Sequence, residues 1–226
     1  LHKEYRRQRQ MCIRDSGATA RSTSQDVELL IRQLNRSGVD GIILDLRKNG
    51  GGLLDEAVAL TGLFIDQGPV VQVRDGKGTV IQRTDDNPGV LYSGPLLVLV
   101  GRRSASASEI VAGALKDLGR ALLVGETTFG KGSVQSVVSL PDGSAARLTT
   151  AKYFTPSRNL IHEHGVSPHI RATLTSDQET ALLRSRRKGE GATTTPPADP
   201  QLNRAVDALQ AVILSAKSTP PRPIKR

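Results

Sequence analysis

The sequence contains very little cysteine and very few aromatic residues. Cys12 is the single cysteine among 226 residues, tryptophan is absent, and tyrosine and phenylalanine occur three times each. One cysteine cannot form an intrachain disulfide or a cysteine-based metal site. With so few aromatic side chains to stack on bases, a nucleic-acid-binding function has little support.

Long apolar runs are also missing. No stretch approaches the roughly 20 apolar residues that a membrane-spanning helix needs. Residues 1–16 lack the apolar middle of a secretory signal, and they show neither periodicity nor a turn signal. We therefore interpret residues 1–16 as a non-native or unstructured leader and exclude them from the fold.

The excess of positive charge lies at the two ends of the chain. The net charge is +9, and residues 1–16 and 184–226 hold five and nine basic residues against two and three acidic ones. Residues 17–183 hold seventeen of each sign. A neutral central region offers no basic surface to a nucleic acid. We expect one domain over residues 17–183, flanked by solvated tails.

The hydrophobic pattern predicts an α/β fold with a mixed sheet and flanking helices. Strands and helices alternate in the first half of the domain, and strands dominate the second half. Gly76-Lys77-Gly78 indicates a hairpin between two alternating runs. The predicted helices cover 24–37, with a cap at Ser24-Gln25-Asp26, 53–65 and 106–118, and the predicted strands cover 41–46, 70–75, 79–84, 96–101, 121–126, 134–140 and 146–154.

The last part of the chain has a different composition. Residues 184–198 are charged and then rich in threonine and proline, which predicts an extended linker. Residues 199–215 regain a helical apolar stripe and are expected to form a C-terminal helix. Residues 216–226 are predicted to be a disordered tail.

Three segments could carry chemistry: DLRKNGGG at 45–52, SASASEI at 104–110 and GETTFGKGSVQ at 125–135. Each also has an ordinary structural interpretation. Ser106 and Glu109 fit the S-x-x-E capping box of a helix start. The glycines at 50–52 fit a tight turn between a strand and a helix.

The third segment resembles a phosphate-binding loop only superficially. Gly125, Gly130 and Lys131 have the spacing of that motif, but Gly132 stands where a serine or threonine should hold magnesium. The residues that follow favour a strand, whereas a phosphate site needs the start of a helix. The segment is better interpreted as a lysine held in a glycine-flanked loop between two strands.

Together, the three segments resemble the C-terminal processing (tail-specific) serine peptidases, and the resemblance covers residues 24 to about 171. It rests on several ordered blocks, among them SASASE, FGKG, GLFIDQGPVVQVRD and LPDGSAARLTTAKYFTPS. The resemblance implies that Ser106 is the nucleophile, Lys131 the general base and Gln135 the residue that orients the lysine. It also implies an oxyanion hole made by the amide of Ala107 and that of Gly52 or Gly51.

The same resemblance implies a crotonase-like α/β core and an endopeptidase that acts, through an acyl-enzyme, on proteins with disordered C-termini. It implies no cofactor, and we assign no metal site. A periplasmic or cell-envelope location follows, with an adaptor protein and an upstream membrane tether left open. Relatives carry a signal peptide and a PDZ domain ahead of this region, and residues 1–23 cannot contain either. Pro168-His169 and Gly50 depart from the common family pattern.

The chemistry of a serine–lysine pair sets a requirement on Lys131. Its amine must be neutral to take a proton from serine, and burial lowers the pKa of a lysine. We therefore expect Lys131 to lie buried between apolar strands. Backbone N–H groups at a glycine loop and a helix start could stabilise the oxyanion.

Three alternatives remain at this point. His162 or His164 could serve a Ser-His-Asp site with Asp45 or Asp142, although no G-x-S-x-G motif is present. The cluster His162-Glu163-His164 could bind a metal ion, but it lacks helical H-E-x-x-H spacing. Finally, the chain could be a non-catalytic scaffold of the same fold.

Overall fold

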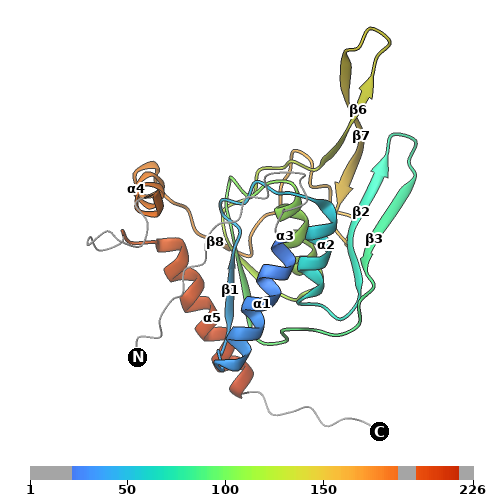
Figure 1. The fold of residues 1–226 in the computed structure, drawn as a ribbon. Coiled ribbons are helices and arrows are strands. Elements are labelled where there is room, and N and C mark those ends of the chain that lie inside the picture. Colours follow the sequence, from blue (N-terminus) through green and yellow to red (C-terminus); the bar gives the residue numbers. More distant parts are fainter. Residues whose placement is uncertain (1–21, 188–196, 219–226) are drawn as a thin grey trace.

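The computed structural model of the chain describes residues 22–187 and 197–218. These residues form five helices and eight strands within the described ranges (Figure 1). In chain order they are α1 Thr23–Arg36, β1 Ile42–Asp45, α2 Leu54–Gly62, β2 Gly68–Asp75, β3 Val80–Asp85, β4 Leu96–Val100, α3 Ala107–Asp117, β5 Leu122–Gly125, β6 Ser133–Ser139, β7 Ala145–Phe154, β8 Ile170–Arg171, α4 Ser176–Arg187 and α5 Pro200–Ser218.

The first sheet is parallel and has the order β1-β4-β5-β8. All five residues of its central strand β4 are buried, as expected for a continuous apolar run covered by helices on both faces. The carboxyl ends of β1, β4 and β5 lead into the three segments singled out in the sequence. Parallel pairing therefore brings these segments to one edge of the sheet.

The second sheet is antiparallel and has the order β3-β2-β7-β6. Its hairpins β2–β3 and β6–β7 project from the body of the molecule (Figure 1). The hairpin predicted around Gly76-Lys77-Gly78 is confirmed. The structure also confirms the α/β class with flanking helices. The parallel strand pairs lie in one sheet and the antiparallel strand pairs in the other. Strand β6 lies at the outer edge of the second sheet.

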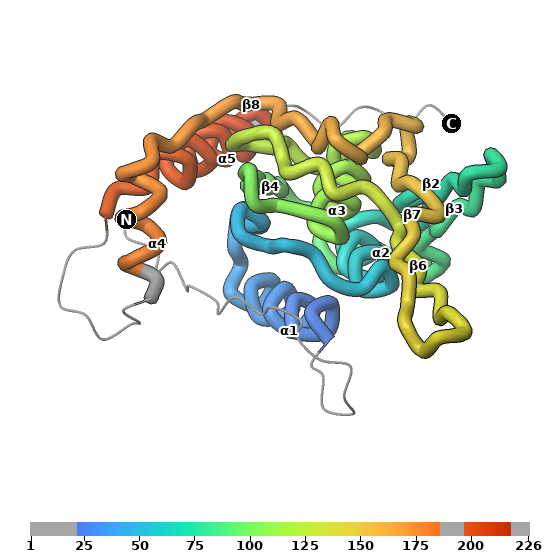
Figure 2. The backbone as a smooth tube through the Cα atoms, turned by 90° about the horizontal axis from the view of Figure 1, so that it is seen from above, coloured from blue at the N-terminus to red at the C-terminus, as the bar shows by residue number. Residues whose placement is uncertain are grey.

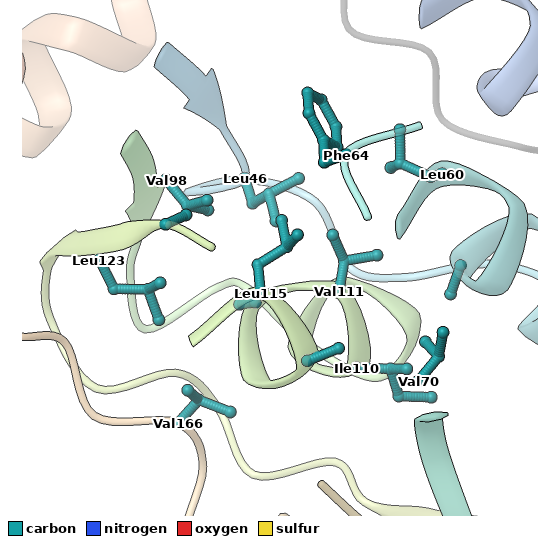
Figure 3. Close-up of a cluster of buried hydrophobic side chains, with 14 of the residues drawn as sticks. Leu46, Leu60, Phe64, Val70, Val98, Ile110, Val111, Leu115, Leu123 and Val166 are labelled. Carbon is teal, nitrogen blue, oxygen red and sulfur yellow. The ribbon is translucent and has the colours of Figure 1, made fainter. Parts of the chain in front are cut away.

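The helices lie on both faces of the parallel sheet (Figures 1 and 2). Helix α5 packs on one face against β1, β4 and β5, where Leu209 joins a small apolar cluster. Helix α3 lies on the other face, beside α2 and β2. Figure 3 shows Leu115 of α3 among apolar side chains of the larger core, including Val98 and Leu123 from the sheet. This packing fixes the start of α3, where Ser106 lies.

Several predicted boundaries shift in the structure. Helix α1 is capped by Ser22, whose Oγ accepts the Gln25 N–H at 3.2 Å, and the predicted cap at Ser24 is wrong because Ser24 lies inside the helix. The linker predicted over 184–198 is wrong at its start, because α4 continues to Arg187. The helix predicted over 199–215 is present as α5, and the disordered tail predicted from 216 is wrong at its first residues because α5 continues to Ser218. Residues 1–16, 188–196 and 219–226 lie outside the described residues.

No helix within the described ranges combines the length and the apolar character that crossing a bilayer requires.

Candidate active site

Ser106 occupies a strained turn between β4 and α3. Its backbone has φ 59° and ψ −121°, in a region that residues with a side chain rarely adopt. It is also the N-cap of α3, and its N–H donates to Oε2 of Glu109 at 2.8 Å. The capping interpretation is therefore correct for Glu109. A strained serine at a helix start also fits a functional residue, because strain of this kind collects at active sites.

The glycine loop after β1 packs directly against this turn. Gly51 has φ +97°, and a Cβ placed on it would lie 2.6 Å from the Ala105 carbonyl oxygen and 2.7 Å from Cβ of Ser106. Asn49 joins the two loops, because its carbonyl oxygen accepts the Ala105 N–H at 3.0 Å and the Ser108 hydroxyl at 2.7 Å. The close approach explains why glycine is needed at position 51.

The Lys131 loop meets the Ser106 turn through one side chain. Glu109 is fully buried, and besides the Ser106 N–H its carboxylate accepts the N–H groups of Gly130 at 2.7 Å and Lys131 at 2.8 Å. It also accepts the Thr128 hydroxyl at 2.5 Å. The structure thus brings the backbones of Ser106 and Lys131 to the same carboxylate. The sequence indicates only a capping role for Glu109, through its S-x-x-E spacing to Ser106.

The predicted burial of Lys131 is wrong, because the residue is exposed. Lys131 lies just before β6, which pairs with one strand, β7, within the described ranges, and no second described strand covers it. Gln135 is also exposed and lies on β6, two residues beyond Ser133. The phosphate-loop alternative fails because a strand, and no helix, follows Lys131.

The glycine loop and the start of α3 present the backbone amides predicted for an oxyanion hole. The Gly51 N–H donates to Oδ1 of Asn49 at 2.9 Å and is therefore occupied. The N–H groups of Gly52 and Ala107 donate no hydrogen bond to another described residue. Of the two glycines left open by the sequence, Gly52 is the better candidate.

A small pocket opens beside these amides. Its walls come from the glycine loop, α2 and the first two turns of α3, and its lining is mainly apolar. The lining residues are Thr23, Leu46, Asn49, Gly51, Gly52, Leu53, Glu56, Ala57, Leu60, Ala107, Ser108 and Val111. An apolar side chain of a bound molecule would fit this lining.

The histidine alternatives receive no support from the contacts. Asp45 forms an ion pair with Arg47, and Asp142 accepts the hydroxyl of Ser144 in the exposed β6–β7 turn. Nδ1 of His164 contacts the carbonyl oxygen of His162 at 2.8 Å. The described residues contain no group of three or more histidine, cysteine or acidic side chains arranged to hold a metal ion.

A buried ion-pair network lies at the carboxyl end of β1. Arg47 is 7% exposed, and its guanidinium donates to both carboxylate oxygens of Asp45 and both of Asp199. Burial alone would lower the pKa of Arg47, but the hydrogen bonds and charges of the two aspartates outweigh it and raise that pKa. The network fixes the start of α5 to the strand that leads into the glycine loop.

His169, one departure from the family pattern, has a defined structural role. Its Nδ1 accepts the N–H of Leu123 at 2.9 Å, and its own N–H donates to the Leu123 carbonyl oxygen at 2.9 Å. Burial and the charge of Lys116 lower the pKa of the imidazole. His169 therefore extends the pairing of β5 with β8, and its neutral imidazole serves as the hydrogen-bond acceptor.

Comparison with known proteins gives consistent results. Residues 12–172 match peptidase family S41. The chain is 40% identical over 206 residues to the carboxy-terminal-processing protease of Bartonella bacilliformis, covering 82% of this chain and 47% of that protein. It is 50% identical over 117 residues to the tail-specific protease of Haemophilus influenzae, covering 52% of this chain and 17% of that protein.

A solved structure resembles the fold as well. The photosystem II D1 C-terminal processing protease superposes with a TM-score of 0.63 at 42% identity, covering 67% of this chain and 39% of that one. The chain spans about a third to a half of the length of the first relatives it matches. The resemblance seen in the sequence is confirmed at the level of the family: the chain belongs to peptidase family S41, to which it is tied by both its sequence and its fold.

Proposed function

We propose that this chain is the catalytic part of a serine endopeptidase that cleaves proteins at or near unstructured C-terminal tails. The observation that carries the proposal is the meeting of the Ser106 turn and the Lys131 loop at Glu109. These two segments are 25 residues apart in the sequence and share one buried carboxylate. The glycine loop packs against the Ser106 turn at the same end of the parallel sheet. The non-catalytic alternative would leave this convergence and the strained serine without a purpose.

In the proposed reaction, the neutral amine of Lys131 takes the proton of the Ser106 hydroxyl as the serine oxygen attacks the peptide carbonyl carbon. Gln135 orients the amine. The carbonyl oxygen gains negative charge, and the N–H groups of Ala107 and Gly52 stabilise it. The C–N bond then breaks, the leaving amine takes the proton, and an acyl-enzyme forms. Water, activated by the same lysine, hydrolyses the ester and restores the serine.

The exposed position of Lys131 fits a substrate that completes the site. Strand β6 has a free outer edge, and an extended peptide can add to such an edge by main-chain hydrogen bonds. A peptide bound there would cover Lys131 and displace water from its amine. Disordered tails can reach this edge as extended strands, whereas folded domains cannot.

The proposal extends to location and partners. Relatives include proteins named as bacterial and chloroplastic processing proteases, which is consistent with a periplasmic or cell-envelope enzyme. The same proposal includes an adaptor protein as a separate partner. It also includes a membrane tether and a PDZ domain ahead of this region. The mechanism derived above uses only side chains and amides of the protein and needs no cofactor.

Replacing Lys131 by arginine tests the mechanism. Arginine keeps the charge but cannot give up its proton at usable pH. We expect Lys131→Arg to be as inactive as Ser106→Ala, with a loss of roughly 10²–10⁴-fold in kcat against a tail peptide. Gln135→Ala should retain more activity than either variant. The matched control is Lys152→Arg on neighbouring strand β7, which should cleave normally.

Two further measurements separate this enzyme from its rivals. Replacement of His162 or His164, and addition of a metal chelator, should leave turnover largely unchanged. A folded Lys131→Arg variant that cleaves a tail peptide at near-normal rate would refute the proposed mechanism.

A further inference from the structure

Glu109 is a charged side chain in a place where charge is costly. It is fully buried in the first turn of α3, and it forms no ion pair with another described residue. A buried carboxylate without a cation must be compensated by hydrogen bonds. Glu109 receives four of them, from three backbone N–H groups and one hydroxyl.

These four bonds are divided between the two carboxylate oxygens in a specific way. Oε2 accepts the N–H of Ser106 and the N–H of Lys131, each at 2.8 Å. Oε1 accepts the Gly130 N–H at 2.7 Å and the Thr128 hydroxyl at 2.5 Å. One oxygen atom therefore bridges the backbones of the proposed nucleophile and the proposed general base.

Thr128 extends the connection to a third segment. While its hydroxyl donates to Glu109, the same oxygen accepts the N–H of Val166 at 2.7 Å. The Lys131 loop also packs closely against the segment around His162. A Cβ placed on Gly132 would lie 2.4 Å from the His162 backbone nitrogen. Glu109 and Thr128 thus fix the loop from two sides.

We infer that Glu109 is a positioning residue that holds the Lys131 backbone in register with the Ser106 turn, and that Thr128 assists it. The inference rests on the proposed function, because it assigns these contacts to the geometry of the serine–lysine pair. A carboxylate is required chemically, since four donors need acceptors on both oxygens. Glutamine has the same shape but presents an NH₂ group to two of the four donors. Aspartate is one methylene shorter and cannot reach the Lys131 loop from α3.

The first experiment uses Glu109→Gln in the full chain with a tail peptide as substrate. We expect kcat to fall at least tenfold while KM changes less than about threefold, because the variant disturbs the catalytic pair and not the peptide-binding edge. The double variant Glu109→Gln/Lys131→Ala should be no slower than Lys131→Ala alone, since residues that act as a unit are not additive. Additive losses would overturn the inference.

Backbone amide hydrogen exchange provides a readout that does not depend on activity. The N–H groups of Ser106, Gly130 and Lys131 should exchange slowly in the unmodified protein and at least tenfold faster in Glu109→Gln. Unchanged protection of all three would overturn the inference. If Ser106→Ala and Lys131→Ala instead cleave normally while the protection is lost, the proposed function fails and Glu109 is left with a structural role only.

A second pair of variants covers the case in which Glu109→Gln does not fold. Thr128→Val removes the hydroxyl at nearly constant shape, and Thr128→Ser restores it. Thr128→Val should lower kcat about tenfold and release the Val166 amide, which donates to that hydroxyl, to exchange. Thr128→Ser should remain near the unmodified protein in both measurements. Equal behaviour of the two variants would contradict the inference. Glu126→Gln, which removes a poorly exposed carboxylate paired with Arg102, is the matched control and should leave kcat unchanged.

Discussion

Gly51 and Gly50 are neighbours in one loop, but a side chain would meet different surroundings at the two positions. At Gly51 the backbone has φ +97°, and an added Cβ would collide with Ala105 and Ser106. At Gly50 no heavy atom lies within 4 Å of an added Cβ. A methyl group at position 51 must therefore displace the turn that carries Ser106.

We expect Gly51→Ala to lower the unfolding free energy by about 1–3 kcal/mol and to reduce kcat/KM at least tenfold. Gly50→Ala should change both quantities little. Urea denaturation and peptide cleavage, measured on the two variants side by side, test this expectation. Comparable behaviour of the two alanine variants would show that the close contact does not constrain the site.

The candidate site residues could be predicted from the resemblance to a known family, but their surroundings could not. The sequence indicated Ser106, Lys131 and Gln135, and these assignments stay predictions, supported by the contacts of Glu109. The prediction that Lys131 is buried was wrong, because an apolar strand pattern next to a residue does not show whether that strand lies at the edge of a sheet. The choice between Gly52 and Gly51 depended on one side-chain bond from Asn49, which no sequence pattern reveals.

At the scale of elements, the contact between Arg47 and Asp199 determines how the end of β1 meets the start of α5. Both side chains are poorly exposed, at 7% and 11%. Removing one partner of a buried pair leaves an uncompensated charge, which typically costs about 3–5 kcal/mol. By contrast, the pair Arg32–Glu28 on α1 is exposed at 54% and 37% and should contribute about 0.5 kcal/mol or less.

We therefore predict that Arg47→Ala lowers the unfolding free energy by about 3–5 kcal/mol, whereas Arg32→Ala lowers it by no more than about 0.5 kcal/mol. Denaturant titration of both variants provides the measurement. Because α5 covers one face of the parallel sheet, the Arg47 variant should also expose the cluster around Leu209 to faster hydrogen exchange. A small, equal effect of the two substitutions would contradict the prediction.

The pairing of β5 with β8 gives the fold a pH dependence. The pKa of folded His169 is lowered, so its contribution to stability is complete above the ordinary histidine pKa of about 6.5 and is lost as pH falls below it. Protonated Nδ1 can no longer accept the Leu123 N–H. The melting temperature should therefore decrease between pH 7.5 and pH 5.5. His169→Asn, which keeps an acceptor but does not titrate, should show a smaller decrease, and an equal decrease would exclude His169 as a source.

Element types were predictable because apolar periodicity differs between strands and helices. Their ends were less predictable, as α1 and α4 show. Ser22 and Ser24 are both suitable caps by residue type, and the choice of Ser22 is linked to a tertiary contact, since its hydroxyl also bonds Glu56 on α2. Helix α4 extends past position 184 although its sequence there is highly charged.

At the scale of the whole molecule, the proposed substrate mode predicts strong selectivity for unfolded segments. A fusion of a compact domain with a disordered C-terminal tail should lose its tail rapidly, while the domain itself resists cleavage. N-methylation of the tail peptide at alternate residues should weaken cleavage, because it removes main-chain donors needed to pair with β6. Mass spectrometry of timed digests gives both results. Equal cutting of domain and tail would contradict edge-strand binding.

The division of the strands between two sheets could not be foreseen from the order of elements. Local patterns distinguish parallel from antiparallel segments, but the sheet that a strand joins depends on contacts far away in the sequence. β7 joins β2, for example, across more than 70 residues. Position in a sheet then decides which residues are exposed, as at Lys131.

The β6–β7 hairpin links a projecting part of the molecule to the loop that carries Lys131. It stands out from the body of the molecule, and its inner end is continuous with the loop that carries Lys131 (Figure 1). Ser106, in contrast, lies between strand β4, whose five residues are all buried, and the largely buried helix α3. A tilt of the hairpin would move the lysine while the serine stays in place. In the proposed function, the position of the hairpin therefore sets the distance between the lysine and the serine, although most of the hairpin lies away from both.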